Sequence, residues 1–253
     1  MKKSFEVLDH VDSELGELLL RRRRIAMLDD EIVHEVQLNG EFLMSSLFHA
    51  AEDALAHLGV EAHGGNCLDV VVGGLGLGYT AAAALACKQV ASVRVVEYLA
   101  PVIGWHREGL LPLGKVLAED ERVRIVQGDF FAMAAGGTGF DPEKGGRKFD
   151  AVLLDIDHTP SHWLHARHGG FYSRDGVLAM AAHLRPGGVF AMWSDGGPEA
   201  GFLEVIGSVF AKALAHEVRF PNPITGGESA SSIYVGSGLA GDQSLRGAGL
   251  STR

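Results

Sequence analysis

The stretch VVVGGLGLGYTAAAALA, residues 70–86, runs from an apolar segment through a glycine-rich turn into a row of small residues. The β-branched run predicts a buried strand, and the small residues after the turn predict a helix that packs closely on it. Because glycine has no Cβ, a ligand can lie against bare peptide N–H groups where the helix begins. Candidate ligand-binding residues are therefore Gly73, Gly74, Gly76 and Gly78. The alternative is a tight turn without a ligand, which needs only one or two glycines.

Outward from this stretch, apolar strands alternate with helices. Near-continuously apolar strands are typical of a parallel sheet covered by helices on both faces. The expected strands are 67–74, 92–99, 122–130, 149–157 and 187–195, and the expected helices are 78–89, 100–111, 173–184 and 199–214. Segments 216–220 and 231–236 follow without a helix between them, which indicates an antiparallel ending. The predicted fold class is α/β, with a Rossmann-like seven-stranded sheet whose last strand is antiparallel.

The first 46 residues have a different pattern, with short β-branched or Leu-rich runs and a hairpin signal at Asn39-Gly40. A helix over 46–59 is expected next, with Gly59 as its stop. We therefore predict three parts, namely an antiparallel β module at 1–46, a catalytic domain at 47–237 and a disordered tail at 238–253. The Gly-rich segment 134–148 is predicted to be a surface loop.

Composition restricts the functional class. The formal charge is −10, and phosphate binding needs a basic surface, so nucleic acid is not an expected partner. The single basic run, Arg21 to Arg24, is predicted to lie on a strand with alternating faces, either solvated or facing a homodimer partner rather than clamping an acidic substrate. Two cysteines, an acidic start and no apolar run of membrane length favour a soluble cytoplasmic protein without a membrane partner.

Two strand ends carry carboxylates that suit a nucleoside. Glu97 ends one predicted strand, and a carboxylate there can accept both hydroxyls of a ribose; otherwise it lies at a solvated helix start. Asp129 follows the next strand and precedes Phe130 and Phe131, so an acceptor for an adenine amino group lies beside flat apolar side chains. Alternatively, Asp129 caps a short helix. The loop also fits a dinucleotide fingerprint with Ala81 at its third position, but that fold needs no such pair.

Taken in order, these segments resemble the class I S-adenosylmethionine-dependent transferases, and within them the spermidine synthase-like branch. The resemblance covers residues 31–236 and includes VVEYLAPVI, QGDFF, LLDIDHTP and LRPGGVF. It implies that the glycine loop lines the methionine side of a sulfonium nucleoside, that Glu97 binds the ribose and that Asp129 binds the adenine. It also implies that Asp155 lies beside the reacting amine.

The segment LLDIDHTP, residues 153–160, supplies the candidate catalytic residues Asp155, Asp157 and His158. At the carboxyl end of a parallel strand, Asp155 would face the ligand crevice. A carboxylate there can orient an ammonium group and receive or relay its proton, unless it is only a structural strand end.

Three positions differ from the spermidine synthase pattern. Gly76 stands where the loop usually has Asp, His158 replaces the second acid of Asp-x-x-Asp, and Leu43 stands where a Gln is usual. Each change removes a polar contact to a polyamine or to a decarboxylated donor. Ordinary S-adenosylmethionine as donor, or another acceptor, is therefore a second hypothesis.

The segment SHWLHARHGGFY, residues 161–172, resembles the family's loop over the acceptor. Trp163 and Tyr172 are expected to wall the acceptor pocket, joined by Trp193 and Asp195 unless these are ordinary edge residues. The spacing of His162, His165 and His168 would suit a metal on one helix face, but no further ligand completes the set, so no metal is expected.

The leading functional hypothesis is transfer of an aminopropyl group from decarboxylated S-adenosylmethionine, as co-substrate, to a small amine. Methyl transfer from S-adenosylmethionine is the alternative. An NAD-dependent oxidoreductase and a non-catalytic nucleoside binder are further hypotheses from other classes.

Overall fold

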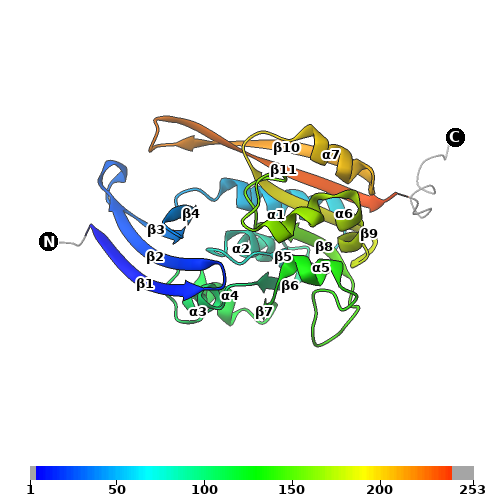
Figure 1. Cartoon of the computed structure of the whole chain (residues 1–253), viewed down its shortest axis with the longest axis horizontal. Helices are drawn as coiled ribbons and strands as arrows, with labels where there is room; N and C mark the ends of the chain where they lie inside the picture. The colour runs from blue at the N-terminus through cyan, green and yellow to red at the C-terminus, as the bar shows by residue number, and fades with distance from the viewer. Residues whose placement is uncertain (1–3, 241–253) are drawn as a thin grey trace.

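The computed structural model describes residues 4–240 and contains two β-sheets (Figure 1). The smaller sheet is antiparallel and consists of β1 (Phe5–Ser13), β2 (Gly16–Ile25), β3 (Glu31–Leu38) and β4 (Glu41–Ser45), with a short 3-10 helix η1 (Ala26–Leu28) after β2. Asn39 and Gly40 join β3 to β4 with φ angles of 53° and 79°. Two-residue hairpin turns of this kind need positive φ at both central residues, so the predicted hairpin is confirmed.

The larger sheet has seven strands in the order β10-β11-β9-β8-β5-β6-β7. They are β5 (Leu68–Gly73), β6 (Val90–Glu97), β7 (Val123–Gln127), β8 (Phe149–Leu154), β9 (Leu184–Asp195), β10 (Phe210–Asn222) and β11 (Gly227–Leu239). Strands β5 to β9 pair in parallel, whereas β11 pairs antiparallel with both β9 and β10. The predicted fold class is confirmed, and the inserted antiparallel strand distinguishes this sheet from the dinucleotide-binding fold.

Helices cover both faces of the larger sheet. One face carries α1 (Ala50–His63), α2 (Tyr79–Ala86), α3 (Ala100–Arg107) and α4 (Gly114–Glu119), and the other carries α5 (Phe130–Ala135), the 3-10 helix η2 (Ala166–Tyr172), α6 (Arg174–Ala181) and α7 (Ala200–Gly207). In β5, Val70 and Val72 pack into the first core, and Val71 packs into the second. This burial of both strand faces explains why the strands are continuously apolar in sequence.

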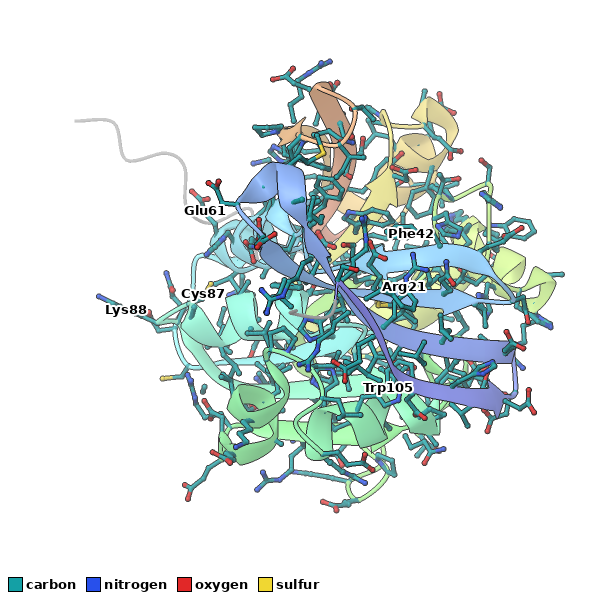
Figure 2. All side chains as sticks on the ribbon, turned by 90° about the vertical axis from the view of Figure 1, so that its left-hand side faces the viewer. Arg21, Phe42, Glu61, Cys87, Lys88 and Trp105 are labelled. Carbon is teal, nitrogen blue, oxygen red and sulfur yellow. The ribbon has the colours of Figure 1, made fainter. Side chains whose placement is uncertain are left out.

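The smaller sheet shares the first of these cores. Leu18, Leu20 and Val36 belong to the same buried cluster as α1 and α2. Trp105 of α3 lies near the small sheet (Figure 2). It is buried, and its indole N–H donates a hydrogen bond to Asp9 of β1 at 2.6 Å. Apolar packing and a partly buried hydrogen bond therefore attach the small sheet to the rest of the fold.

Several predicted helix ends were wrong, and α3 ends at Arg107 rather than at residue 111. The helix α1 continues past Gly59 to His63 and ends at Gly64, which has a φ of 68°. Gly59 is required for packing, because a Cβ there would lie 2.4 Å from Leu153 Cδ2. The helix α7 ends at Gly207, and the apolar residues from Phe210 onward start β10 instead. A short apolar run is compatible with either helix or strand, so its sequence alone did not decide between them.

At the chain end, β11 extends to Leu239, two residues beyond the predicted boundary at 237. The rest of the predicted tail, 241–253, lies outside the described residues. Among residues 4–240, no helix combines the length and the apolar character needed to cross a bilayer.

The arginine run lies on β2, and its side chains alternate between faces as predicted. Arg21 and Arg23 both bind Glu35 on one face, at 2.8 and 2.7 Å. Arg22 binds Glu6 on the other face at 2.7 Å. Most of this positive charge is therefore neutralised within the small sheet.

The Gly-rich segment 134–148 is held to the amino ends of the parallel strands. Phe140 is fully buried, and Asp141 binds both Arg94 of β6 and Arg147, at 2.8 and 3.1 Å. Arg147 also binds Asp69 at the start of β5, at 3.0 Å. Arg185 of β9 extends the same network to Asp69 and to Asp150 of β8. This segment is thus an anchored part of the fold.

We predict opposite effects for the same substitution at two helical glycines. Gly59→Ala should lower the free energy of unfolding by about 1–3 kcal/mol, because its Cβ would collide with the buried Leu153. Gly104→Ala in α3 should raise it by about 0.5–1 kcal/mol, because nothing lies within 4 Å of its new Cβ and alanine favours helix. Urea unfolding of both variants is the measurement, and a stabilised Gly59→Ala protein would contradict the packing argument.

Candidate functional site

A cavity of about 470 Å³ lies at the carboxyl ends of the parallel strands. The ends of β5, β6, β7, β8 and β9 form its base. Its outer wall comes from distant parts of the chain, namely Phe42–Ser45 of β4, Phe48, the start of α1, and Phe220, Asn222, Ser229 and Ser231 of the β10–β11 hairpin. Open parallel sheets bind ligands at this edge.

The glycine loop after β5 lines this cavity through Gly74, Gly76 and Gly78, whose φ angles are 93°, 48° and 96°. A Cβ at Gly74 would lie 2.1 Å from the carbonyl oxygen of Asp155, so the loop approaches β8 as closely as backbone allows. Gly73, the last residue of β5, does not line the cavity; a Cβ there would lie 2.6 Å from the ring of Phe130.

His106 of α3 contacts the backbone of the glycine loop, and this residue was not identified from the sequence. Its Nε2 lies 2.9 Å from the carbonyl oxygen of Gly76, and burial lowers the pKa of the imidazole. The neutral ring can therefore donate a hydrogen bond to that carbonyl. A histidine inside the apolar stripe of the predicted helix 100–111 was the available signal.

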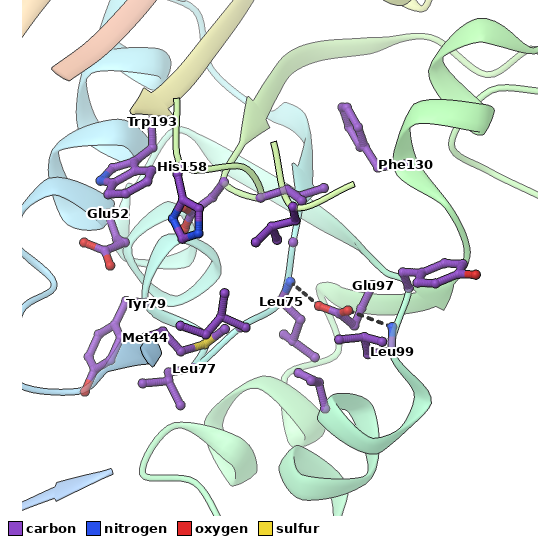
Figure 3. A pocket seen from close by; sticks show the side chains of 18 of the residues that line it. Met44, Glu52, Leu75, Leu77, Tyr79, Glu97, Leu99, Phe130, His158 and Trp193 are labelled. Atoms are coloured by element: carbon purple, nitrogen blue, oxygen red, sulfur yellow. Dashed lines mark hydrogen bonds between the residues drawn. The ribbon is translucent and has the colours of Figure 1, made fainter. Parts of the chain in front are cut away.

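Glu97, at the end of β6, binds the loop backbone from the other side. Its two carboxylate oxygens accept hydrogen bonds from the N–H groups of Leu75 and Leu99, at 2.9 and 2.8 Å (Figure 3). Burial raises the pKa of Glu97, and these N–H donors oppose that shift. Each oxygen keeps a second lone pair, so the group can still accept hydroxyl protons from the cavity.

Asp129 is the N-cap of α5, as the alternative interpretation held. One of its oxygens accepts from the N–H groups of Phe131 and Ala132, at 3.0 and 3.2 Å. The other lies 3.5 Å from Nε of Arg167, whose guanidinium covers the ring of Tyr98 at 4.8 Å. Asp129 and Phe130 both line the cavity, so this end combines a carboxylate with flat apolar surfaces.

Asp155 follows β8 and faces the cavity. Its Oδ2 accepts a hydrogen bond from the hydroxyl of Thr80 at 2.7 Å, and burial raises its pKa to about 6. Thr80 belongs to the first turn of α2, so the glycine loop and Asp155 are held in one arrangement.

A second acid, Glu52 of α1, lines the same cavity and was missed by sequence reasoning. Burial and the charge of Asp155 raise the pKa of Glu52 to about 8. The sequence contained a signal, because Glu52 shares a helix stripe with the buried residues Leu55, Ala56 and Gly59. A carboxylate on that stripe points toward the core rather than toward solvent.

Asp157, predicted to be catalytic, does not line the cavity. It is 3% exposed and accepts hydrogen bonds from the N–H of Leu164, from His168 Nδ1 and from the hydroxyl of Tyr172, at 2.8, 2.9 and 2.8 Å. His168 in turn stacks on Phe131 at 4.0 Å and lines the cavity. The Asp157 carboxylate therefore holds the segment 158–172 in place through hydrogen bonds to three of its residues.

Trp163 and Tyr172 were predicted to form the wall of an acceptor pocket, but neither lines the cavity. Their rings stack on each other instead, with centroids 6.3 Å apart. The Trp163 indole donates to the carbonyl of Pro160 at 2.7 Å, and the Tyr172 hydroxyl is used by Asp157. His158, Trp193 and Asp195 do line the cavity. Of the four residues predicted to form an acceptor pocket, Trp193 and Asp195 therefore line the cavity, whereas Trp163 and Tyr172 do not.

Trp193, His158 and Glu52 lie on one side of the cavity, opposite Glu97 (Figure 3). The indole Nε1 of Trp193 is buried without a hydrogen-bond partner among residues 4–240. Within the same residues, no group of His, Cys, Asp or Glu side chains is arranged to hold a metal ion.

Acidic side chains outnumber lysine and arginine in the lining. The acidic residues are Glu52, Glu97, Asp129, Asp155 and Asp195. In the described chain, Arg167 is the only lysine or arginine that lines this cavity, and it lies at the Asp129 end. The opposite end, around Glu52 and Asp155, suits a cationic ligand.

Solved spermidine synthases share the fold. The crystal structure of spermidine synthase from Thermotoga maritima matches with a TM-score of 0.69 and 18% identity, over 91% of this chain and 72% of that one. Spermidine synthase in complex with the transition-state analogue AdoDATO matches with a TM-score of 0.69 and 19% identity, over 91% and 73% of the two chains. A probable spermidine synthase from Corynebacterium glutamicum gives 0.58 and 15%, over 92% and 80%.

No family model and no curated protein sequence matches this chain. The structural likeness at these identities shows that the chain has the spermidine synthase fold.

Removing charge from Asp157 should loosen the segment that it supports. We expect Asp157→Asn to lower the free energy of unfolding by about 1–3 kcal/mol, because a buried acceptor is lost to the His168 and Tyr172 donors. Hydrogen–deuterium exchange should rise most in residues 158–172. Asp175→Asn, at an exposed carboxylate, is the matched control. Unchanged protection of the segment in Asp157→Asn would refute its supporting role.

The raised pKa values of Glu52 and Asp155 predict that the free energy of unfolding depends on pH. The pKa of Glu52 rises from 4.5 to about 8 on folding, and that of Asp155 from 3.8 to about 6, so the folded state retains more protons than the unfolded state. Their contribution to stability is therefore complete at low pH and is lost as pH rises through the folded pKa values.

Glu52→Gln should consequently gain stability relative to the wild type between pH 5 and pH 8.5, a range that brackets the folded pKa of Glu52, measured by urea midpoints. Glu61→Gln, at an exposed position on the same helix, should show no such pH-dependent difference. A constant difference for Glu52→Gln across this range would mean that Glu52 titrates normally.

Proposed function

We propose that the protein transfers an aminopropyl group from a decarboxylated S-adenosylmethionine-type sulfonium donor to a small amine. The observation that carries this proposal is Asp155, a buried carboxylate that faces an acidic cavity beside a glycine loop. Two cations, the sulfonium donor and an amine, suit a cavity of this charge. The fold shared with spermidine synthases supports the same reaction class.

The nucleoside would occupy the half of the cavity that β5, β6 and β7 form. In this proposal the ribose hydroxyls donate to Glu97, and the adenine amino group donates to Asp129. Tyr98 and Phe130, which both line the cavity, offer apolar surfaces to the base. The positive φ angles of the glycine loop leave its backbone open to the ligand.

The reaction needs a neutral amine and an in-line approach to carbon. The amine nitrogen donates its lone pair to the carbon next to sulfur, and a C–N bond forms as the C–S bond breaks. The electron pair of that bond stays on sulfur, which leaves as a neutral thioether. The incoming amine is an ammonium in water, so before the attack it must give up one proton, and the product leaves as the ammonium that the new C–N bond creates; the acceptor of that proton is Asp155. Its pKa of about 6 suits proton transfer near neutral pH.

The electrophile is already activated by its positive sulfur, so the protein contributes mainly by positioning. The hydrogen bond from Thr80 fixes the Asp155 carboxylate, and the closure of Gly74 on β8 fixes the donor loop relative to it. Both reactants would therefore be held by groups that the same strand ends position.

Methyl transfer from S-adenosylmethionine is the second candidate. It is favoured by Gly76 and Leu43, where the resemblance leads one to expect the Asp and Gln of a spermidine synthase. Against it, the amino-acid carboxylate of that donor would lie near Asp155 and Glu52, with no lysine or arginine among the cavity-lining residues of that end.

The test is product analysis by mass spectrometry with either donor and a series of diamines. Aminopropyl transfer yields methylthioadenosine and a longer amine from the decarboxylated donor, whereas methyl transfer yields S-adenosylhomocysteine. Asp155→Asn should lower kcat by about 10²–10⁴-fold, because proton acceptance is lost. Its affinity for methylthioadenosine should stay within about threefold, because Asp155 contacts the amine rather than the nucleoside.

Unchanged turnover in Asp155→Asn would contradict the catalytic assignment. Release of S-adenosylhomocysteine alone would select methyl transfer. If neither product forms but the protein binds the nucleosides, the protein is a non-catalytic nucleoside binder.

A further inference from the structure

The glycine loop offers no acid to the ammonium group of an aminopropyl donor. Gly76 has a φ of 48°, a backbone conformation that residues other than glycine rarely adopt. A Cβ at this position would already lie 3.3 Å from Sδ of Met44. Met44 therefore occupies the space beside the loop, and the partner for that ammonium must come from another element.

Glu52 is the acid that the opposite wall provides. It lies in the first turn of α1, lines the cavity and faces the same space as Tyr79 and Met44 (Figure 3). Its neighbour Asp53 binds His49 at 2.8 Å, but no ion pair within residues 4–240 includes Glu52. The carboxyl group is thus available to a ligand, and a cation bound beside it would favour its ionised form.

We propose that Glu52 binds the primary ammonium of the donor's aminopropyl arm and thereby makes the site selective for a donor without a carboxylate. This inference rests on the proposed aminopropyl transfer and adds to it the residue that decides between the two sulfonium donors. Glu52 acts here as a binding residue, whereas Asp155 remains the group beside the acceptor amine.

Electrostatics give the direction of this selectivity. An ammonium placed beside Glu52 relieves the repulsion between Glu52 and Asp155, since it supplies the cation that this end of the described cavity lacks. A donor with an amino-acid end would bring a third carboxylate to the same place. Hydrogen bonds between charged groups out of water are among the stronger ones, so the discrimination should be measurable as affinity.

Calorimetric titration tests the inference with three nucleosides, namely the decarboxylated donor, S-adenosylmethionine and methylthioadenosine. Methylthioadenosine has no ammonium arm, so it reports the nucleoside half alone. For Glu52→Gln we expect the Kd of the decarboxylated donor to rise roughly 10–100-fold and that of methylthioadenosine to stay within about threefold. The preference over S-adenosylmethionine should shrink by a similar factor.

Two control variants define the role of charge. Glu52→Asp keeps the carboxylate and should keep the preference for the decarboxylated donor, although its shorter side chain binds more weakly. Glu61→Gln changes an exposed carboxylate of the same helix and should bind all three nucleosides as the wild type does. Glu61 lies at the surface, as Figure 2 shows.

Three other results would overturn the inference. Equal weakening of all three nucleosides by Glu52→Gln would mean that Glu52 only supports the fold of the site. Unchanged donor affinity with a raised KM for the amine would assign Glu52 to the acceptor. Failure of the wild type to bind either the decarboxylated donor or methylthioadenosine would refute the proposed function itself, and the role of Glu52 with it.

Discussion

The contact between Gly74 and the end of β8 is the constraint on which the site depends. The carbonyl oxygen of Asp155 lies where a side chain of residue 74 would be, and the N–H of Asp155 donates to the carbonyl of Gly73 at 2.8 Å. This closeness brings Thr80, six residues after Gly74, within hydrogen-bond distance of the Asp155 carboxylate. A larger residue at 74 would separate the two strand ends and disrupt both the loop and the acid.

The two halves of the cavity are built in different ways. The half assigned to the nucleoside comes from strand ends and loops between residues 74 and 131, so local sequence patterns reveal it. The other half combines the small sheet, the start of α1 and the β10–β11 hairpin, with Phe48 and Phe220 in contact at 5.8 Å. Such a wall exists only after folding, and of the three positions that differ from the spermidine synthase pattern, Leu43 lies in it.

The success of sequence-based prediction followed this division. Continuous apolar strands, the glycine loop and Asn39-Gly40 have local signatures, and the predicted sheet and hairpin were confirmed. Glu52 was not predicted because a carboxylate in a helix usually faces water. Only its helical spacing from the buried Leu55 and Ala56 indicates that it points inward. The position of Asp157 depends on Leu164, His168 and Tyr172, partners up to 15 residues away, so its neighbour Asp155 gave no guide to its orientation.

The ion-pair network at the amino ends of the strands has a consequence for heat tolerance. Asp69, Arg147 and Arg185 link three strands and the segment 134–148, at the end of the sheet opposite the cavity. The cost of removing charges from water falls as temperature rises, so networks of this kind contribute relatively more when the protein is warm. Segment 134–148 has the composition of a surface loop but carries part of this network, so shortening it should lower the temperature at which the sheet unfolds.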